Sequence, residues 1–226
     1  LIITQKVDKN DPVLGFFHRW LEELAKNFEA ITVICLEKGE DHFPGIKVLS
    51  LGKEEGNDVI NYIFQFYKYI WQERDNYDAV LVHMNQEYVL LAGDVWRFMG
   101  KRVYLWRNHA QGSFLTRMAA WLSEKVFYTS PSSFTARFKN AIQMPVGVDT
   151  DFFKPDQSVE RIPGSVLFLG RISPVKRVLE FIDWVKDKGL KATIAGPILP
   201  ADKDYGERVK LALTPEIKFL GPVTQE

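Results

Sequence analysis

The chain has 226 residues, of which 46% are hydrophobic and 13% aromatic, enough for a packed core and for one or two domains. Lysines plus arginines number 29, as do aspartates plus glutamates, so no overall charge attracts the protein to nucleic acid. The single cysteine, Cys35, excludes an intrachain disulfide and a cysteine-based metal cluster, and it fits a reducing cytoplasm. No apolar run reaches the roughly 20 residues of a membrane-spanning helix.

Short apolar runs alternate with segments of helical periodicity along residues 1–144. Strands are predicted at Leu1–Thr4, Ile31–Leu36, Ile46–Leu51, Ala79–His83, Arg102–Trp106, Val126–Tyr128 and Ile142–Met144. Helices are predicted at Val13–Phe28, Asp58–Arg74, Glu87–Met99 and Phe114–Leu122. This alternation is typical of an α/β domain whose parallel sheet carries helices on both faces.

The predicted helix Asp58–Arg74 has apolar side chains on two sides. One stripe is predicted to face the core, and it consists of Ile60, Ile63, Phe64, Tyr67, Ile70 and Trp71. The other side carries Tyr62, Phe66 and Tyr69, which we expect to pack against a neighbouring loop. The alternative is an exposed aromatic patch that meets a membrane surface or a partner.

The alternation stops at Pro145, and residues 145–163 are predicted to connect an N-terminal domain, residues 1–144, to a second domain, residues 164–226. In the second domain, strands are predicted at Val166–Leu169, Lys191–Ala195 and Ile217–Leu220, and helices at Val175–Lys188 and Arg208–Leu213. A doubly wound domain usually has five or six strands. We therefore expect the chain to end partway through its second domain.

The first strand of the second domain runs into Gly170, directly before a predicted helix. Ser173 suits an N-cap and Pro174 the first helical position, and the free N–H groups of such a helix start bind anions. Arg171 and Lys176 lie at this same end, where the helix dipole repels cations. A diphosphate between them would account for both, whereas the alternative is that they are solvated or paired with nearby acids.

Four segments together resemble glycosyltransferase family 4. They are Pro-Val-Gly-Val-Asp-Thr-Asp-Phe-Phe-Lys-Pro from Pro145, Leu-Phe-Leu-Gly-Arg-Ile-Ser-Pro-Val-Lys from Leu167, Ala-Thr-Ile-Ala-Gly-Pro from Ala192 and Phe-Leu-Gly-Pro-Val from Phe219. The likeness is dense over residues 144–223 and architectural over residues 1–140. It implies two Rossmann-like parallel-sheet domains of the GT-B type, the second incomplete in this chain, and a retaining transferase that uses a nucleotide diphosphate sugar.

The resemblance also implies roles for particular residues at the donor's diphosphate. It implies that Arg171 and Lys176 hold the diphosphate, with Gly170 at the same turn. The family usually has a Gly-Gly pair in the loop after the first strand, and here only Gly15 matches, preceded by Leu14. The resemblance therefore implies a backbone approach to the phosphates at Gly15 alone.

Three strand ends supply further candidates for the cleft between donor and acceptor. His109 follows the strand Arg102–Trp106, and the resemblance implies that it contacts the donor sugar and acts in catalysis. The alternative for His109 is a side chain satisfied by loop hydrogen bonds. His83, Asn85 and Gly196 are weaker candidates for the same cleft.

The sequence predicts no metal and no other cofactor. Asp149-Thr150-Asp151 spells an Asp-x-Asp, which binds a divalent cation in another glycosyltransferase fold. Here it falls in the predicted connection, where the resembling family carries similar residues without a metal, so we assign it to loop structure. The absence of a Gly-x-Gly-x-x-Gly sequence argues against a dinucleotide oxidoreductase.

The leading hypothesis is a cytoplasmic, metal-independent hexosyltransferase that moves a sugar from a nucleotide diphosphate donor to a hydroxyl of a glycan or lipid-linked acceptor. The inner face of the membrane is the alternative location, and nucleic acid is not an expected partner. A nucleotide-sugar epimerase of the same fold and a non-catalytic nucleotide-sugar-binding protein are the alternative functions. We expect these 226 residues alone to be inactive, because the family's Glu-seven-residue-Glu donor motif is absent from them.

Overall fold

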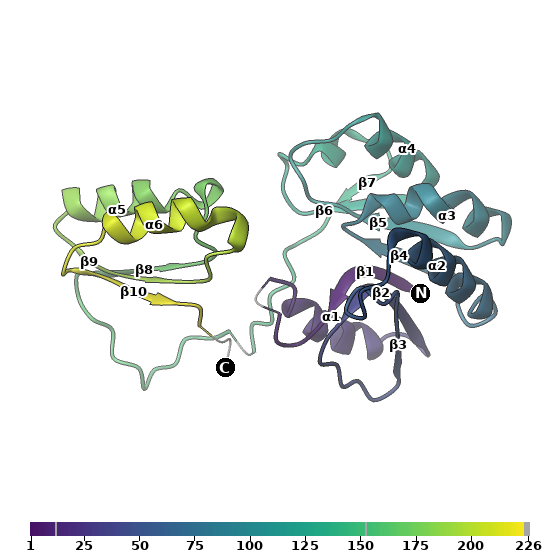
Figure 1. The fold of residues 1–226 in the computed structure, drawn as a ribbon, viewed down its shortest axis with the longest axis horizontal. Coiled ribbons are helices and arrows are strands. Elements are labelled where there is room, and N and C mark those ends of the chain that lie inside the picture. Colours follow the sequence, from purple (N-terminus) through teal and green to yellow (C-terminus); the bar gives the residue numbers. More distant parts are fainter. Residues whose placement is uncertain (12, 152, 224–226) are drawn as a thin grey trace. The chain divides into compact units, whose positions relative to one another are not determined.

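The computed structural model of the protein describes residues 1–11, 13–151 and 153–223. Pro12, Phe152 in the predicted connection, and residues 224–226 of the predicted second domain lie outside the described residues. The chain divides into two compact units, Leu1–Asp149 and Thr150–Glu226 (Figure 1). None of the described helices is long and apolar enough to cross a membrane.

The first unit is built on a seven-stranded sheet in the order β3-β2-β1-β4-β5-β6-β7, and all neighbouring strands pair in parallel. The strands are β1 (Ile2–Val7), β2 (Ile31–Lys38), β3 (Ile46–Ser50), β4 (Ala79–His83), β5 (Arg102–Trp106), β6 (Lys125–Tyr128) and β7 (Ala141–Gln143). The order reverses between β1 and β4. Open α/β sheets bind ligands outside the carboxyl ends of the strands at such a point.

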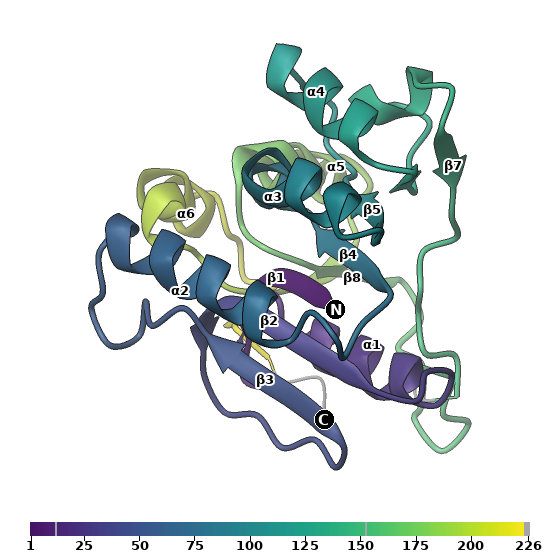
Figure 2. The ribbon, with the colours of Figure 1, turned by 90° about the vertical axis from the view of Figure 1, so that its right-hand side faces the viewer.

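Helices cover the two faces of this sheet unequally. One face carries α2 (Val59–Gln72), α3 (Gln86–Phe98) and α4 (Phe114–Leu122), and the other carries α1 (Phe16–Ala25) (Figures 1 and 2). Successive residues of β1 enter the two cores, with Ile3 beside α2–α4 and Ile2 beside α1. A 3₁₀ turn, η1 (Phe134–Arg137), precedes β7.

The prediction for the buried face of α2 was wrong. Of the predicted core stripe only Ile70 is buried, and five members are exposed: Ile60, Ile63, Phe64, Tyr67 and Trp71. Phe66, expected to meet a loop, lies in the core with its ring centroid 5.9 Å from that of Trp96 on α3. Both sides of α2 are apolar, so periodicity could not choose between them, and the fit against α3 decides.

The second unit contains three parallel strands among its described residues, in the order β10-β9-β8. They are β8 (Ser165–Leu169), β9 (Lys191–Ala195) and β10 (Ile217–Gly221). Helices α5 (Val178–Asp187) and α6 (Lys203–Leu211) pack on one face of this sheet, and η3 (Pro200–Asp202) leads into α6 (Figure 1). Leu167, Leu169 and Leu220 alternate with the core residues of their strands and are exposed on the other face.

Two residues of α2 test which face supports the fold. Phe66 is 1% exposed and Phe64 is 66% exposed. We expect Phe66→Ala to lower the free energy of unfolding by about 3–5 kcal/mol because it opens a cavity in the core. Phe64→Ala, the matched control on the same helix, should change it by at most about 0.5 kcal/mol. Urea unfolding of both variants measures the difference, and a larger loss for Phe64→Ala would contradict the assignment.

Candidate functional site

Three glycines lie where the three strands of the second unit end. Gly170, Gly196 and Gly221 have φ angles of 155°, 146° and 75°, a region that favours glycine. The Gly196 N–H donates to the Gly221 carbonyl (2.7 Å), and the Gly170 N–H donates to the Ala195 carbonyl (3.0 Å). A Cβ on Gly196 would lie 1.9 Å from the carbonyl oxygen of Gly170. Gly196 is therefore a position that no side chain could occupy, whereas a Cβ on Gly170 or Gly221 would meet little but would be strained by the positive φ.

Arg171 projects from this edge and is paired with an acid. Its Nε lies 3.7 Å from an Oδ of Asp202, which belongs to η3 after β9. The side chain remains 39% exposed, and its Nε makes no hydrogen bond within the part of the chain that the structure describes. At 3.7 Å the contact is a loose ion pair, so Asp202 orients the guanidinium without saturating its five donors.

The prediction that one continuous helix begins shortly after Gly170 was wrong. Pro174–Lys176 make one 3₁₀ turn, η2, then Arg177 has a left-handed conformation (φ 54°), and α5 begins only at Val178. Ser173 is therefore no cap of α5: it makes no capping hydrogen bond, and its hydroxyl, though buried, has no partner among the described residues.

Tertiary pairing explains the delayed helix. Ile172 is fully buried, and its N–H donates to the Pro197 carbonyl (2.9 Å) in the loop after β9. This bond holds the chain against the neighbouring strand end before a helix can form. As a result, Lys176 and Arg177 are exposed at a tight turn, five and six residues after Arg171 in the sequence.

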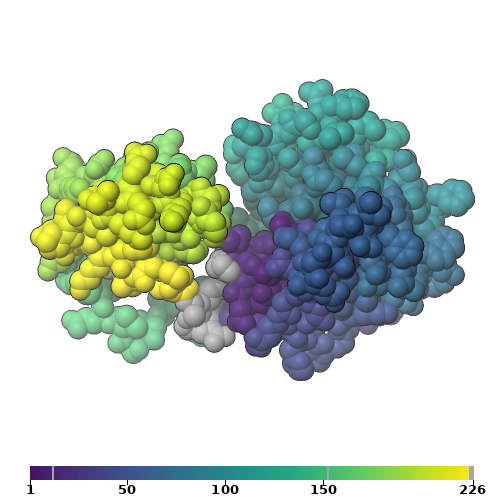
Figure 3. All heavy atoms as spheres, viewed as in Figure 1, coloured from purple at the N-terminus to yellow at the C-terminus, as the bar shows by residue number. Residues whose placement is uncertain are grey.

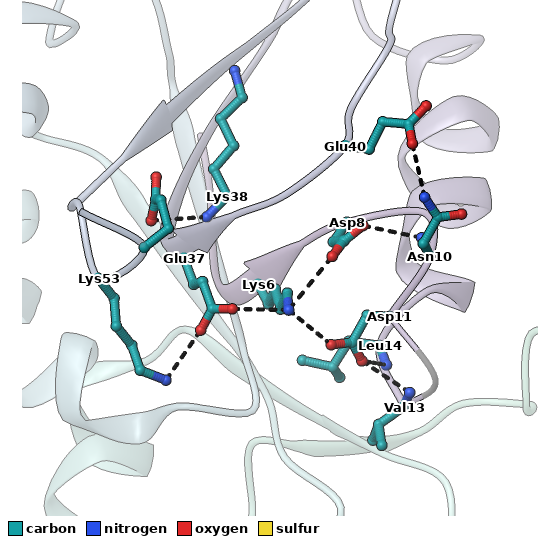
Figure 4. A network of polar contacts seen from close by, with 11 residues as sticks. Lys6, Asp8, Asn10, Asp11, Val13, Leu14, Glu37, Lys38, Glu40 and Lys53 are labelled. Carbon is teal, nitrogen blue, oxygen red and sulfur yellow. Dashed lines mark hydrogen bonds and ion pairs between the residues drawn. The ribbon is translucent and has the colours of Figure 1, made fainter. Parts of the chain in front are cut away.

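In the first unit, the loop after β1 is closed on itself (Figure 4). An Oδ of Asp11 accepts hydrogen bonds from the N–H groups of Val13 (2.9 Å) and Leu14 (2.7 Å), and the Gly15 N–H donates to the Asp11 carbonyl (3.0 Å). A Cβ on Gly15 would lie 2.6 Å from that carbonyl oxygen. Local packing accounts for this glycine, and the N–H groups predicted to approach the donor phosphates are satisfied within the loop.

A lysine near the end of β1 holds the same loop through ion pairs, a feature that the sequence did not reveal. Lys6, near the end of β1, contacts carboxylates of Asp8 (3.4 Å), Asp11 (3.1 Å) and Glu37 (2.8 Å) (Figure 4). Lys53 also pairs with Glu37 at 3.1 Å. The hydrogen bond that the Lys6 ammonium donates to Glu37 raises the pKa of Lys6 above its ordinary value. Asp8 and Asp11 follow Lys6 in the same segment, but Glu37 comes from β2, so no local pattern could have found the whole cluster.

His83 ends β4 but is built into the core. It is 3% exposed, its Nδ1 lies 3.2 Å from the Thr4 hydroxyl, and its ring stacks on Phe17 with centroids 4.3 Å apart. Burial lowers the pKa of His83 to about 4. The side chain is therefore neutral at physiological pH and fixed by packing.

His109 is exposed in the loop after β5. The Gln111 N–H donates to its Nδ1 (3.1 Å), and its carbonyl accepts from the Phe134 N–H (2.9 Å). Asn85 precedes α3 and makes no capping hydrogen bond with its side chain. Because β4 and β5 pair in parallel, His83, Asn85 and His109 come to the same edge of the sheet. Of these three residues, His109 has an exposed side chain and lies in a loop that hydrogen bonds hold in place.

The predicted Asp-x-Asp segment spans the boundary of the two units, since Asp149 ends the first and Thr150 begins the second. An Oδ of Asp149 lies 3.7 Å from a guanidinium nitrogen of Arg19 on α1. Nearby, the Trp20 indole N–H donates to the Gly147 carbonyl (3.2 Å). Within the described residues, no three histidine, cysteine, aspartate or glutamate side chains are arranged to share a metal ion.

A hollow of about 660 Å³ lies at the opposite edge of the first sheet. Its lining includes the first residues of β4 and β5, Ala79 and Arg102, together with Phe28 after α1 and Tyr104 on β5. It is separate from the strand ends that carry His83 and His109.

Comparisons with solved structures identify the fold. The lipopolysaccharide outer core galactosyltransferase WaaB is similar with a TM-score of 0.61 and 12% identity, over 99% of this chain and 68% of that one. A Staphylococcus aureus MnaA–UDP complex is similar with a TM-score of 0.56 and 11% identity, over 98% of this chain and 68% of that one. The UDP-GlcNAc 2-epimerase of Methanocaldococcus jannaschii is similar with a TM-score of 0.51 and 13% identity, over 99% of this chain and 74% of that one.

No protein-family model matches the sequence, and no curated protein matches it. At these identities the likenesses show the fold alone. The chain has the GT-B architecture of two Rossmann-like α/β domains, as predicted, and it spans about two-thirds of the length of WaaB.

The burial of His83 predicts a pH dependence of stability. Its pKa is about 4 in the folded protein and about 6.5 when unfolded, so the unfolded chain binds the extra proton between these values. Stability should therefore fall as the pH drops from 6.5 to 4, by about 3 kcal/mol from this group. Urea unfolding of the protein and of His83→Gln across this range measures the difference, and His42→Gln, at an exposed histidine, is the control. Parallel curves for the protein and His83→Gln would contradict the assignment.

Proposed function

We propose that the protein is a glycosyltransferase that takes a sugar from a nucleotide diphosphate and retains the configuration at the anomeric carbon. The observation that carries this proposal is the edge of the second sheet at Gly170, Gly196 and Arg171. There, a backbone surface without side chains lies next to an oriented guanidinium. A diphosphate is the ligand whose oxygens suit both features.

The charges of this edge suit the proposed chemistry. As the bond between the sugar and the phosphate breaks, its electrons leave with the nucleoside diphosphate. Arg171, with Lys176 on the exposed η2 turn, stabilises this charge more in the transition state than in the ground state. The acceptor hydroxyl bonds to the anomeric carbon on the same face, and its proton passes to the departing phosphate oxygen. No step requires a metal ion or another cofactor.

The first unit supplies the acceptor side in this proposal. His109 is the side chain proposed to contact the donor sugar, because it is exposed and its loop is held by hydrogen bonds to Gln111 and Phe134. His83, which is neutral and buried, is proposed to hold the carboxyl end of β4 in place by packing. The proposed acceptor is a glycan or a lipid-linked sugar on the cytoplasmic side.

The comparisons support a second candidate. A UDP-GlcNAc 2-epimerase shares the fold with a TM-score of 0.51, and an enzyme of that kind would also bind a diphosphate at the second sheet. It would interconvert the donor without an acceptor. A binding protein without activity would bind the donor and leave it unchanged.

Removing either proposed diphosphate contact tests the site. In the whole protein, Arg171→Ala and Lys176→Ala should each lower turnover by about two to three orders of magnitude. Calorimetry should show affinity for UDP weakened about ten- to a hundredfold, as for the loss of a charge-assisted hydrogen bond. Lys188→Ala removes the same charge from the other end of α5 and should change neither quantity. Normal turnover and UDP affinity in both test variants would refute the diphosphate site.

The donor incubated alone distinguishes the reaction classes. We expect NMR of UDP-sugars with the whole protein to show no epimer, and transfer with retention once an acceptor is added. The transfer rate should be unchanged by EDTA. Formation of an epimer without acceptor would establish the second candidate, and loss of transfer in EDTA with recovery in manganese would direct attention to Asp149 and Asp151.

A further inference from the structure

The layer of helices on the first sheet has an apolar outer surface. α2, α3 and α4 lie side by side on one face of the sheet (Figures 1 and 2), and α2 and α4 reach the molecular surface in the space-filling view (Figure 3). We define the α4 patch by its exposed side chains Phe98, Phe114, Leu115, Met118 and Trp121. Phe98 and Trp121 are 94% and 67% exposed. Large apolar side chains that gather on the surface in this way are typical of an interaction site.

The exposed stripe of α2 enlarges this surface. Phe64 and Trp71 lie on the outer side of α2, and the Tyr67 hydroxyl donates to the Leu91 carbonyl of α3 (2.6 Å). This bond joins the stripe to the neighbouring helix. Exposed apolar side chains therefore occur on all three adjacent helices of this layer, together with the exposed acids Glu87 and Asp94 of α3.

The chain around the α4 patch is strongly basic, although the protein as a whole has no net charge. Between Asp94 and Asp149 there are eight lysines and arginines and one acid, Glu124. Among the described residues, none of these eight cations forms an ion pair with a carboxylate. Lys101 and Arg107 donate to the carbonyls of Tyr77 and Gln111. Arg97 and Arg117 are exposed on α3 and α4, with one exposed acid, Asp94, a turn before Arg97, so these two arginines are the cations that the helix layer offers to a partner.

Cations and aromatic side chains are in direct contact at this surface. The Arg97 guanidinium lies over the Trp121 ring, 5.2 Å from its centroid, which ties the end of α3 to α4. Arg117 is exposed on α4, in the same turns as Phe114 and Trp121. Aromatic rings with arginines at their border suit the boundary between lipid headgroups and acyl chains.

We propose that the α4 patch binds the surface of an anionic lipid bilayer, with its aromatic side chains in the headgroup region and Arg97 and Arg117 on lipid phosphates. Charge argues for this occupant over a second copy of the chain, because two such surfaces facing each other would repel. The breadth of the surface argues for a bilayer over a peptide, which binds in a groove. This inference concerns location and holds whichever reaction the second unit supports.

Flotation with lipid vesicles tests the proposal. The protein should bind phosphatidylcholine vesicles that contain phosphatidylglycerol and should not bind phosphatidylcholine alone. Phe114→Ser/Trp121→Ser should lower the partition coefficient about tenfold or more. Arg97→Gln/Arg117→Gln should lower it about fivefold for each cation removed, and added salt should have a similar effect.

A matched control removes apolar surface elsewhere. Leu211 and Val159 in the second unit are also exposed, so Leu211→Ser/Val159→Ser should leave vesicle binding unchanged, and circular dichroism verifies that each variant is folded. Three results would each overturn the proposal. They are no binding to anionic vesicles, equal binding to neutral vesicles, and sedimentation velocity showing that the patch variants abolish a dimer while vesicle binding persists.

Discussion

Because neighbouring strands pair in parallel in both sheets, every strand must be followed by a segment that crosses a face of its sheet, and the carboxyl ends of the strands meet at one edge. This constraint gathers residues that are far apart in sequence. It brings the loop after β1 beside Glu37 of β2, and it brings Asp202 after β9 to Arg171 after β8. The place of the candidate site follows from the parallel pairing of the strands, and the individual side chains determine which ligand it suits.

The cations at these edges have different electrostatic environments, which separates structural from functional roles. Lys6 is surrounded by three carboxylates and holds a loop, so its charge is satisfied inside the protein. Arg171 has one acid at 3.7 Å and keeps an exposed side chain. Arg97 and Arg117 form no ion pair among the described residues, and Arg97 lies over an exposed indole. The fewer carboxylates a cation has, the more it can gain from an external anion.

The sequence was sufficient to locate the strands of both sheets, because most of them contain a short apolar run. It failed where two outcomes satisfy the same local pattern. On α2 both sides are apolar, and only contact with Trp96 selects Phe66 as the core residue. At Ser173 and Pro174 the local signals for a helix start are good, but the bond from Ile172 to Pro197 delays α5. At Gly15 the sequence could not reveal that Asp11 occupies the loop's N–H groups.

The proposed membrane surface bears on the choice between the two candidate reactions. A nucleotide sugar is a small, water-soluble anion, so an epimerase that acts on it alone gains nothing from residence at a bilayer. A transferase with a lipid-linked acceptor gains the local concentration of that acceptor, since docking reduces a three-dimensional search to the plane of the membrane. The proposed membrane contact of the α4 patch and of the exposed Arg97 and Arg117 therefore favours transfer to a membrane-bound acceptor over interconversion of a soluble donor, independently of any residue in the second unit.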